Sequence, residues 1–521
     1  MIFWKKFYIY FIIILSFYKI IYCGNKTEPG KPFPNGFIWA VGSSAFQIEG
    51  ATKEDGRGPT IWDYYMGEKG YIADNSTAEI SCNSYHKYEE DVSLVKNLNV
   101  THYRFSIAWS RIFPRGITSE INQKGVDYYN NLINLLLENN VEPIITLHHF
   151  DLPLALHFKG GWLNDNIQDW YAEYARFCFQ NFGDRVKYWV TFNEPNQQAL
   201  EGYCGSNNLL APGSFDEHCS WTVYQAAYNQ LIAHGKAAEI YRNEFSRRQN
   251  GKIGINLAAI ALDAESIKHQ SAADLWNDLY FGLFAHPIFT TKGNYPPSVI
   301  ALFQDLMRKD NSTVQRLRMF SQEEAILLRG SADFLGLSYY YTRMVKKGYV
   351  KTSSKNIGEL YNKDAGVTLF INPHWQKVGD RWITHTPHGL YNYLNYIKTN
   401  YKNTSIFVLQ NGCYDVGNEG LEDKTRIVYM KTHLEAIQDA IEAGANVIGY
   451  TAWSLMDSFE FRHGYTVKFG LYHVNFSDPD RTRIPKRSVE FYKNVTSENR
   501  IGPYFNEIIK QEDYQNINIL N

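Results

Sequence analysis

The clearest candidate for chemistry is the sequence TFNEP at residues 191–195. The run 188–190 before it is apolar and predicts a buried strand, which Pro195 ends because proline has no backbone N–H to donate. Asn193 and Glu194 are therefore expected at the carboxyl end of a strand, where parallel barrels build their active sites. A carboxylate there can protonate a leaving group or activate water. Glu194 would also fit if it only capped the next helix, so this segment alone leaves both interpretations open.

The rest of the chain predicts the elements that would hold such a segment. Short β-branched and aromatic runs indicate buried strands at 141–147, 186–192, 253–257, 405–409 and 447–453. Apolar residues at helical spacing indicate helices at 125–139, 166–182, 221–245 and 424–443. Alternation of strands and helices predicts a parallel sheet. No linker or repeat divides the chain, so we expect one (β/α)8 TIM barrel with long inserted loops over residues 24–510. A doubly wound open sheet is the alternative fold, but the chain lacks the GxGxxG and GxxxxGK[ST] phosphate motifs.

Composition excludes several classes of function. The chain has 521 residues with 52 basic and 54 acidic side chains and a net charge of −2, so it lacks a field that would gather nucleic acid. Aromatic residues make up 16%, which suits a large core and flat ligands such as sugar rings. HExxH, GxSxG and compact Cys/His sets are missing from the sequence, so we expect no metal site and no cofactor.

The amino terminus predicts export. Lys5 and Lys6 precede an apolar run at 7–17, and small residues follow near Cys23, which is the order of a cleaved signal peptide over residues 1–23. Lys19 interrupts any longer apolar span, although a signal anchor is the alternative. The tail at 511–521 is polar and carries neither an apolar anchor nor a retention signal. We therefore predict a secreted protein without stable membrane insertion.

Cysteines and glycosylation motifs agree with this compartment. An oxidising environment would allow one disulfide, for which Cys204 and Cys219 are the nearest loop-to-loop candidates. Sequons predict a glycoprotein and occur at Asn25, Asn75, Asn99, Asn311, Asn403, Asn475 and Asn494.

Ten ordered segments resemble glycoside hydrolase family 1, the group of β-glucosidase, lactase-phlorizin hydrolase and myrosinase. They span Phe33 to about Val495 and include FIWAVGSSAFQIEG, SYHKYEEDV, YRFSIAWSRIFPRG, TLHHFDLP, TFNEP, DFLGLSYYYT, YTAWSLMDSFEF, GYTVKFGLYHVNF and RTRIPKRS. The tenth is the stretch at 407–412. The resemblance implies a (β/α)8 barrel and a retaining mechanism, in which two carboxylates about 5 Å apart act as acid/base and nucleophile.

The resemblance also implies roles for individual residues. Glu194 matches the acid/base and Asn193 the residue that reaches the sugar 2-hydroxyl. The implied contacts to the bound glycoside come from Gln47, Arg104, His149, Tyr340, Trp382, Trp453, Glu460 and Phe461. Amides, imidazoles and carboxylates suit vicinal hydroxyls, and an indole face covers the apolar side of a pyranose. Trp382 matches the residue that packs on the departing group, while Arg104 and Tyr340 match residues beside the nucleophile.

One departure changes the functional expectation. The family has glutamate, asparagine and glycine where this chain reads Gln410-Asn411-Gly412, so an amide stands at the nucleophile position. A neutral amide neither attacks well nor balances the positive charge of an oxocarbenium-like transition state. We expect a rate loss of roughly 10^4- to 10^6-fold. Without the neighbouring anion, we also expect a lower pKa for Glu194 and an Arg104 guanidinium that faces no carboxylate.

Other substitutions lie in the same motifs. Phe150 and Phe461 replace family tryptophans, and Ser338 and Ser458 replace asparagines, which removes polar contacts but keeps an aromatic cleft. Asp415 and Cys413 are the remaining nearby groups that could replace the nucleophile. No sequence feature directs the Asp415 carboxylate toward the anomeric carbon. The Cys413 thiol is expected to be inert, because a buried unpaired thiol usually is.

The sequence therefore predicts a secreted β-glucosidase-like protein whose partner is a small-molecule β-glycoside and whose hydrolysis is weak or absent. Three alternatives follow: a binding protein without turnover, a weak glycosidase or transglycosidase that uses another nucleophile, and an interaction protein with a vestigial pocket. The oligomeric state stays open.

Overall fold

The computed structural model describes residues 30–204, 210–215, 217–309, 316–351, 358–379 and 381–502. The expected signal peptide and polar tail, and the sequons at Asn25 and Asn311, lie outside these ranges. Within them, no helix has the length and apolar character needed to cross a bilayer.

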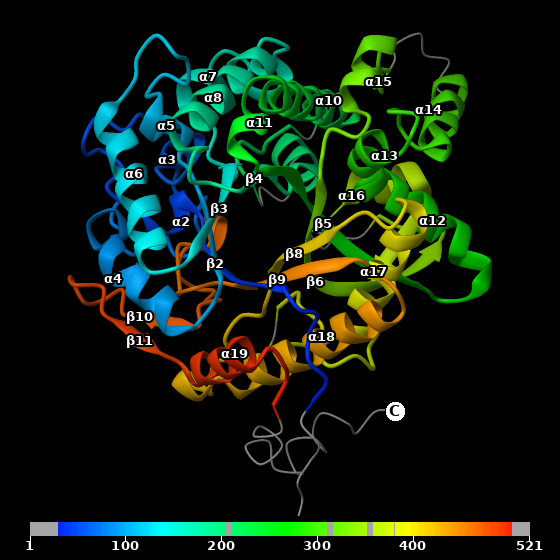
Figure 1. Ribbon diagram of the computed structural model, residues 1–521. Coiled ribbons are helices and arrows are strands. Elements are labelled where there is room, and N and C mark those ends of the chain that lie inside the picture. The colour runs from blue at the N-terminus through cyan, green and yellow to red at the C-terminus, as the bar shows by residue number, and fades with distance from the viewer. Residues whose placement is uncertain are drawn as a thin grey trace, which may run out of the picture.

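Parallel strands close into a barrel (Figure 1). In the described part of the chain the eight barrel strands are β1 (Ile38–Gly42), β2 (His102–Ser106), β3 (Glu142–His148), β4 (Tyr188–Asn193), β5 (Lys252–Ala264), β6 (Phe334–Lys347), β8 (Ile406–Asn411) and β9 (Val447–Trp453). Each pairs in parallel with its neighbour, and the pairing of β1 with β9 closes the ring. The predicted (β/α)8 barrel is confirmed, and the open doubly wound sheet is wrong because no barrel strand is left at an edge.

Helices surround the barrel (Figure 1). The longer ones that cover it are α4 (Ser84–Asn97), α6 (Gln123–Glu138), α8 (Ile167–Phe182), α10 (Cys219–Ile240), α17 (Pro387–Asn400), α18 (Lys424–Glu442) and α19 (Arg487–Glu498). The four helices predicted from apolar spacing correspond to α6, α8, α10 and α18, and the one predicted to reach residue 245 continues from α10 as a π-helical turn, η3 (Tyr241–Phe245).

The inserted loops contain short elements of their own. Between the strands lie α2 (Ala45–Ile48), α3 (Ile61–Tyr65), α5 (Trp109–Ile112), α7 (Leu154–His157), α9 (Pro195–Gln197), α11 (Ser246–Gln249), α12 (Gln270–Asn277), α13 (Leu283–Phe289), α14 (Pro297–Lys309), α15 (Gln322–Leu328) and α16 (Glu359–Ala365). Strand β7 (Val367–Phe370) pairs antiparallel with the end of β6, and β10 (Tyr472–Val474) forms a ladder with β11 (Arg483–Pro485).

Apolar side chains form a compact cluster within the barrel. Its members come from five strands and are Ile38, Ala40, Ile144, Val190, Phe334, Phe407 and Leu409. The cluster is buried and therefore fills the barrel rather than leaving a pore. Polar residues that follow on the same strands, such as Asn193 and Gln410, are left at the carboxyl rim.

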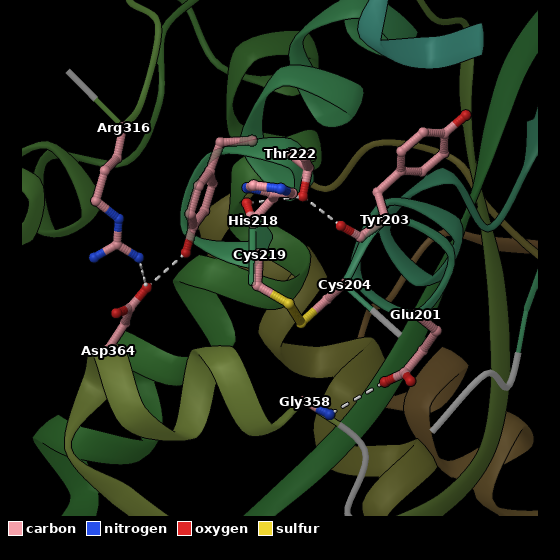
Figure 2. Close-up of a disulfide and its surroundings, with 10 residues drawn as sticks. Glu201, Tyr203, Cys204, His218, Cys219, Thr222, Arg316, Gly358 and Asp364 are labelled. Carbon is pink, nitrogen blue, oxygen red and sulfur yellow. Dashed lines mark hydrogen bonds and ion pairs between the residues drawn. A yellow bond between two sulfur atoms is a disulfide. The ribbon is translucent and has the colours of Figure 1, made fainter. Parts of the chain in front are cut away.

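A disulfide joins Cys204 to Cys219, which confirms the predicted candidate pair (Figure 2). It ties the segment after β4 to the first residue of α10. Close by, the Gly358 N–H donates to the Glu201 carboxylate at 3.2 Å. In the described part of the chain the other cysteines, Cys82, Cys178 and Cys413, are buried thiols.

Candidate active site

A cavity of about 380 Å³ opens at the carboxyl rim of the barrel. Its lining includes ten of the eleven residues expected at the site: Gln47, His149, Asn193, Glu194, Tyr340, Trp382, Gln410, Trp453, Glu460 and Phe461. Arg104 is the exception, because it is fully buried beneath the wall. The barrel thus brings together residues that are more than 400 positions apart in the chain.

Glu194 lies immediately before α9, but its side chain does not cap the helix. Strand β4 ends at Asn193, and Glu194 occupies the N-cap position with φ 45° and ψ 52°, while its carboxylate makes no capping hydrogen bond. Its backbone N–H donates to the Asn256 carbonyl oxygen at 2.8 Å instead. A left-handed backbone at a non-glycine residue is strained, and such strain concentrates at functional sites. The interpretation of Glu194 as a simple helix cap is therefore wrong, and its carboxylate lines the cavity.

Arg104 lies behind the cavity lining and contacts three other strands through its guanidinium group. Its guanidinium donates to Asn193 Oδ1 at 2.7 Å, to Thr146 Oγ1 at 3.1 Å and to the Leu409 carbonyl oxygen at 2.9 Å. All three acceptors are neutral, as the sequence led us to expect. Burial lowers the pKa of Arg104 to about 10, and attraction to Glu194 opposes this shift.

His149 and Asn193 form a second contact in the wall. Asn193 Nδ2 lies 3.1 Å from His149 Nε2, so Nε2 acts as the acceptor and Nδ1 carries the proton. Burial lowers the pKa of His149 well below its usual value, which keeps the ring neutral. The ring also stacks on Trp453 with centroids 5.6 Å apart. His149 Nδ1 is buried and has no partner among the described residues, so its proton lacks an acceptor within the protein.

Gln410 is held by neutral hydrogen-bond donors. Its Oε1 accepts from Ser338 Oγ at 2.5 Å and from Asn256 Nδ2 at 3.3 Å. Asn256 Nδ2 also donates to Asn193 Oδ1 at 2.8 Å, so the same amide links the ends of β4 and β8. Because Oε1 is occupied and Gln410 lines the cavity, its Nε2 is the polar atom left to meet a ligand.

Burial raises the pKa of Glu194, whereas the nearby Ser338 hydroxyl and attraction to Arg104 lower it. The net shift is upward from the ordinary value of a glutamate, because the cost of burying a charged carboxylate is the largest effect in the folded protein. The expected lowering compares Glu194 with the same site carrying an anion at position 410, and it stays a prediction. Burial therefore shifts Glu194 toward the protonated form that a general acid requires, without help from a second catalytic carboxylate.

Glu460 is a second carboxyl group in the cavity. Burial raises its pKa to about 8, while Ser458 and Gln47 act in the opposite direction. Ser458 Oγ donates to Glu460 Oε1 at 3.1 Å. Gln47 Oε1 accepts from Ser44 Oγ at 2.7 Å, which leaves Gln47 Nε2 as the donor that faces the Glu460 carboxyl group. Near neutral pH this part of the cavity offers both donors and acceptors, as sugar hydroxyls require.

The raised pKa of Glu460 predicts a loss of stability with pH. The unfolded chain releases this proton near pH 4.5, whereas the folded protein holds it up to about pH 8. Folding therefore becomes less favourable as the pH rises through this window. Urea unfolding should show that Glu460→Gln removes roughly 3 kcal/mol of the stability that the unmodified protein loses between pH 5 and pH 8. Glu442→Gln, at an exposed ion pair, is the matched control, and equal slopes for Glu460→Gln and the unmodified protein would contradict the prediction.

Neither group considered as a replacement nucleophile reaches the cavity. Both Asp415 carboxylate oxygens accept from Lys486 Nζ at 2.8 Å, and Arg426 pairs with the same carboxylate. Cys413 is fully buried, and burial raises the pKa of its thiol to about 12, so a thiolate is disfavoured. Asp415 and Cys413 are missing from the cavity lining, which leaves Glu194 and Glu460 as its carboxyl groups among the described residues.

Sequence reasoning missed part of the lining. The further residues are Gln197, Leu210, Ala258, Ala259, Ile260, Tyr280, Tyr341, His463 and Phe469, besides the noted substitutions Phe150 and Ser338. Tyr341 follows a recognised motif residue and could have been found from that proximity. Ala258, Ala259 and Ile260 are aliphatic, so their residue types do not indicate a binding site. They line the cavity because β5 extends past the rim.

Comparisons with known proteins agree with this geometry. The model of glycosyl hydrolase family 1 matches residues 30–501. Human cytosolic beta-glucosidase is 39% identical over 472 residues, which cover 90% of this chain and 98% of that protein. Aphid myrosinase superposes with a TM-score of 0.85 at 38% identity, covering 90% of this chain and 100% of that one. A rice β-glucosidase superposes with a TM-score of 0.80 at 37% identity, covering 88% and 98%. The chain belongs to glycosyl hydrolase family 1.

Proposed function

We propose that this protein is secreted, binds β-glucosides in the barrel cavity and hydrolyses them slowly or not at all. The observation that carries the proposal is the neutral amide of Gln410, held by Ser338 and Asn256 at the end of β8. The family resemblance assigns this position to the catalytic nucleophile and Glu194 to the acid/base. In a retaining mechanism the first would attack the anomeric carbon while the second protonates the leaving oxygen.

The proposed defect concerns the nucleophile and leaves the acid/base in place. Glu194 lines the cavity with a raised pKa and can supply the proton. The positive charge that develops on the sugar would meet an amide dipole in place of a carboxylate, which removes the electrostatic stabilisation of the transition state and the covalent intermediate. Protonation without attack leaves hydrolysis slow.

The polar part of the cavity supports binding. His149 Nδ1 is a buried donor without a partner among the described residues, and Gln47 and Glu460 place an amide and a carboxyl group in the same lining. An unpaired buried donor is costly, so a ligand that supplies oxygen acceptors is favoured. Trp453 adds an aromatic face to the same cavity, which suits the apolar side of a sugar ring.

Export rests on a different set of features. The basic and apolar residues at 1–23 have the order of a signal peptide, and the Cys204–Cys219 disulfide is typical of an oxidising compartment. Expression of the full chain in a secretory host, followed by sequencing of the amino terminus in the medium, tests this part. Retention of the protein inside the cell would contradict it.

Binding and turnover should separate in one sample of purified protein. Calorimetry with methyl β-D-glucoside should show saturable binding, while kcat for 4-nitrophenyl β-D-glucoside should be roughly 10^4-fold or more below that of human cytosolic beta-glucosidase assayed in parallel. Formate added to the assay tests for an outside nucleophile. Ordinary turnover without formate would contradict the proposed defect, and failure to bind any glucoside would contradict the proposed ligand.

A further inference from the structure

The sequons in the described part of the chain differ in what the fold does with their side chains. They are Asn75, Asn99, Asn403, Asn475 and Asn494. A sequon alone does not say whether its asparagine carries a sugar, because an N-linked glycan is bulky and must lie on the surface of the folded protein. The hydrogen bonds of each amide and each hydroxyl group separate these sites.

Asn475 lies in an exposed turn between β10 and β11, at the periphery of the molecule (Figure 1). Its Oδ1 accepts from the Ser477 N–H at 3.1 Å, so the side chain folds over its own backbone in an Asx turn. Its Nδ2 donates to no residue that the structure describes. This nitrogen is the atom to which a glycan bonds, and it is therefore free to carry a sugar.

The Arg481 side chain holds this turn in place. Its guanidinium donates to the carbonyl oxygens of Phe476 at 2.9 Å, Asp478 at 2.8 Å and Ser81 at 2.9 Å. Because these bonds fix the backbone on both sides of the turn, the Asn475 amide is kept at the surface.

Asn75 offers a second open amide close to the first. Its Oδ1 accepts from the Gly70 N–H at 3.3 Å within the same exposed loop, and its Nδ2 likewise has no partner among the described residues. Tyr465 connects the two loops, since its hydroxyl donates to the Thr77 carbonyl oxygen at 2.9 Å and its ring centroid lies 4.1 Å from that of Phe476. The two open amides therefore belong to neighbouring surface loops.

Asn403 has the same N-x-S type of sequon as Asn475, but the fold uses its amide. Its Nδ2 donates to the Gly444 carbonyl oxygen at 3.1 Å, and its Oδ1 accepts from the Asn446 N–H at 3.0 Å. These bonds join the turn before β8 to the turn before β9. A sugar on Nδ2 would compete with Gly444 for the nitrogen and crowd this contact, so chains that fold well enough to be exported should seldom carry one.

The other two sequons involve α19. Asn99 Nδ2 donates to Ser497 Oγ at 3.1 Å. Asn494 lies within α19, and the Thr496 hydroxyl of its sequon is buried and donates to the Leu98 carbonyl oxygen at 2.7 Å. Neither sequon combines a free amide nitrogen with an exposed hydroxyl group.

We propose that Asn475 and Asn75 carry N-linked glycans in the secreted protein and that Asn403 stays unmodified. This inference rests on the proposed export. The donor is an oligosaccharide linked through a diphosphate to a lipid, and an oligosaccharyl transferase of the secretory pathway transfers it. The asparagine Nδ2 attacks the anomeric carbon of the first sugar, so an N–C bond forms while the C–O bond to the diphosphate breaks. The nitrogen loses one of its two protons, and the lipid diphosphate departs.

Site mapping on the full protein, collected from the medium of a secretory host, measures the occupancy of each sequon. Peptide-N-glycosidase in heavy-oxygen water converts each glycosylated asparagine to a labelled aspartate, which peptide mass spectrometry quantifies. Asn475 and Asn75 should be occupied in most chains. Occupancy of Asn403 should be roughly tenfold lower or less, because its two hydrogen bonds in the fold oppose a glycan there.

Two serine-to-alanine substitutions form a matched pair, since each removes the hydroxyl group of a sequon and keeps its asparagine. Ser477→Ala should remove one glycan from the intact mass of the secreted protein, whereas Ser405→Ala should remove none. Thr77→Ala should remove the glycan of Asn75 in the same way. If a variant does not reach the medium, the site mapping on the unmodified protein decides alone.

The outcomes separate this inference from the proposed export. A secreted protein in which Asn475 or Asn75 is unmodified would overturn the site assignment and leave export intact. Occupancy of Asn403 equal to that of Asn475 would also overturn it, as would an unchanged glycan mass in secreted Ser477→Ala. Retention of the chain inside the cell without any glycan would overturn export itself, together with the inference that rests on it.

Discussion

Gln410→Glu should raise kcat for 4-nitrophenyl β-D-glucoside by on the order of 10^4-fold. Ser338 Oγ and Asn256 Nδ2 already donate to the Oε1 atom of Gln410, so a carboxylate would enter a site with its hydrogen-bond donors in place. Arg104 is buried without a carboxylate partner and would favour the added negative charge. Steady-state kinetics on the purified variant measure the gain.

Gln410→Asn is the matched control, since it keeps an amide at the same position and adds no charge. It should show no gain. If Gln410→Glu folds, binds methyl β-D-glucoside and still fails to hydrolyse the aryl substrate faster than the unmodified protein, the neutral amide is not the cause of the slow turnover. Ser338→Asn in the same background then tests whether the serine also limits the reaction.

The second large effect concerns Glu194 and becomes measurable in the Gln410→Glu background. Adding Glu194→Gln should reduce kcat/KM for methyl β-D-glucoside by roughly 10^2- to 10^4-fold, which is the usual contribution of a positioned proton donor. Loss of kcat/KM for 4-nitrophenyl β-D-glucoside should be smaller, because nitrophenolate leaves without protonation. Comparing the two substrates isolates the role of Glu194 as an acid.

A general loss of binding would look different. Both substrates would then lose kcat/KM by the same factor, and that equal loss would contradict the assignment of Glu194 as the acid. Glu460→Gln in the Gln410→Glu background provides the comparison, because Glu460 lies in the same cavity and is assigned to sugar contacts rather than to proton transfer.

Much of the fold could be predicted because local patterns and topology agree. The apolar run before Asn193 is β4, and the amphipathic segment at 424–443 is α18 with one residue fewer. Parallel strands place their carboxyl ends on one rim, and the family resemblance assigned residues as distant as Gln47 and Glu460 to one site, where the cavity lining brings them together. The Cys204–Cys219 pair followed from proximity in the chain.

Other features depend on three-dimensional surroundings that no motif encodes. The sequence indicates that Glu194 lacks an anionic neighbour but not how far it is buried, and burial determines the direction of its pKa shift. Arg104 could be placed beside position 410, yet its contact with Asn193 Oδ1 emerged only from the fold. Ala258, Ala259 and Ile260 line the cavity, yet their aliphatic residue types give no sign of this in the sequence.

Labelling with 2-deoxy-2-fluoro-β-D-glucosyl fluoride tests most directly whether covalent attack at position 410 is missing. The reagent carries its own good leaving group and traps a glycosyl–enzyme bond wherever a nucleophile attacks the anomeric carbon. Intact-mass analysis should show no adduct on the unmodified protein and one fluoroglucosyl adduct on Gln410→Glu, located at residue 410 by peptide mapping. An adduct on any side chain of the unmodified protein would contradict the proposed defect.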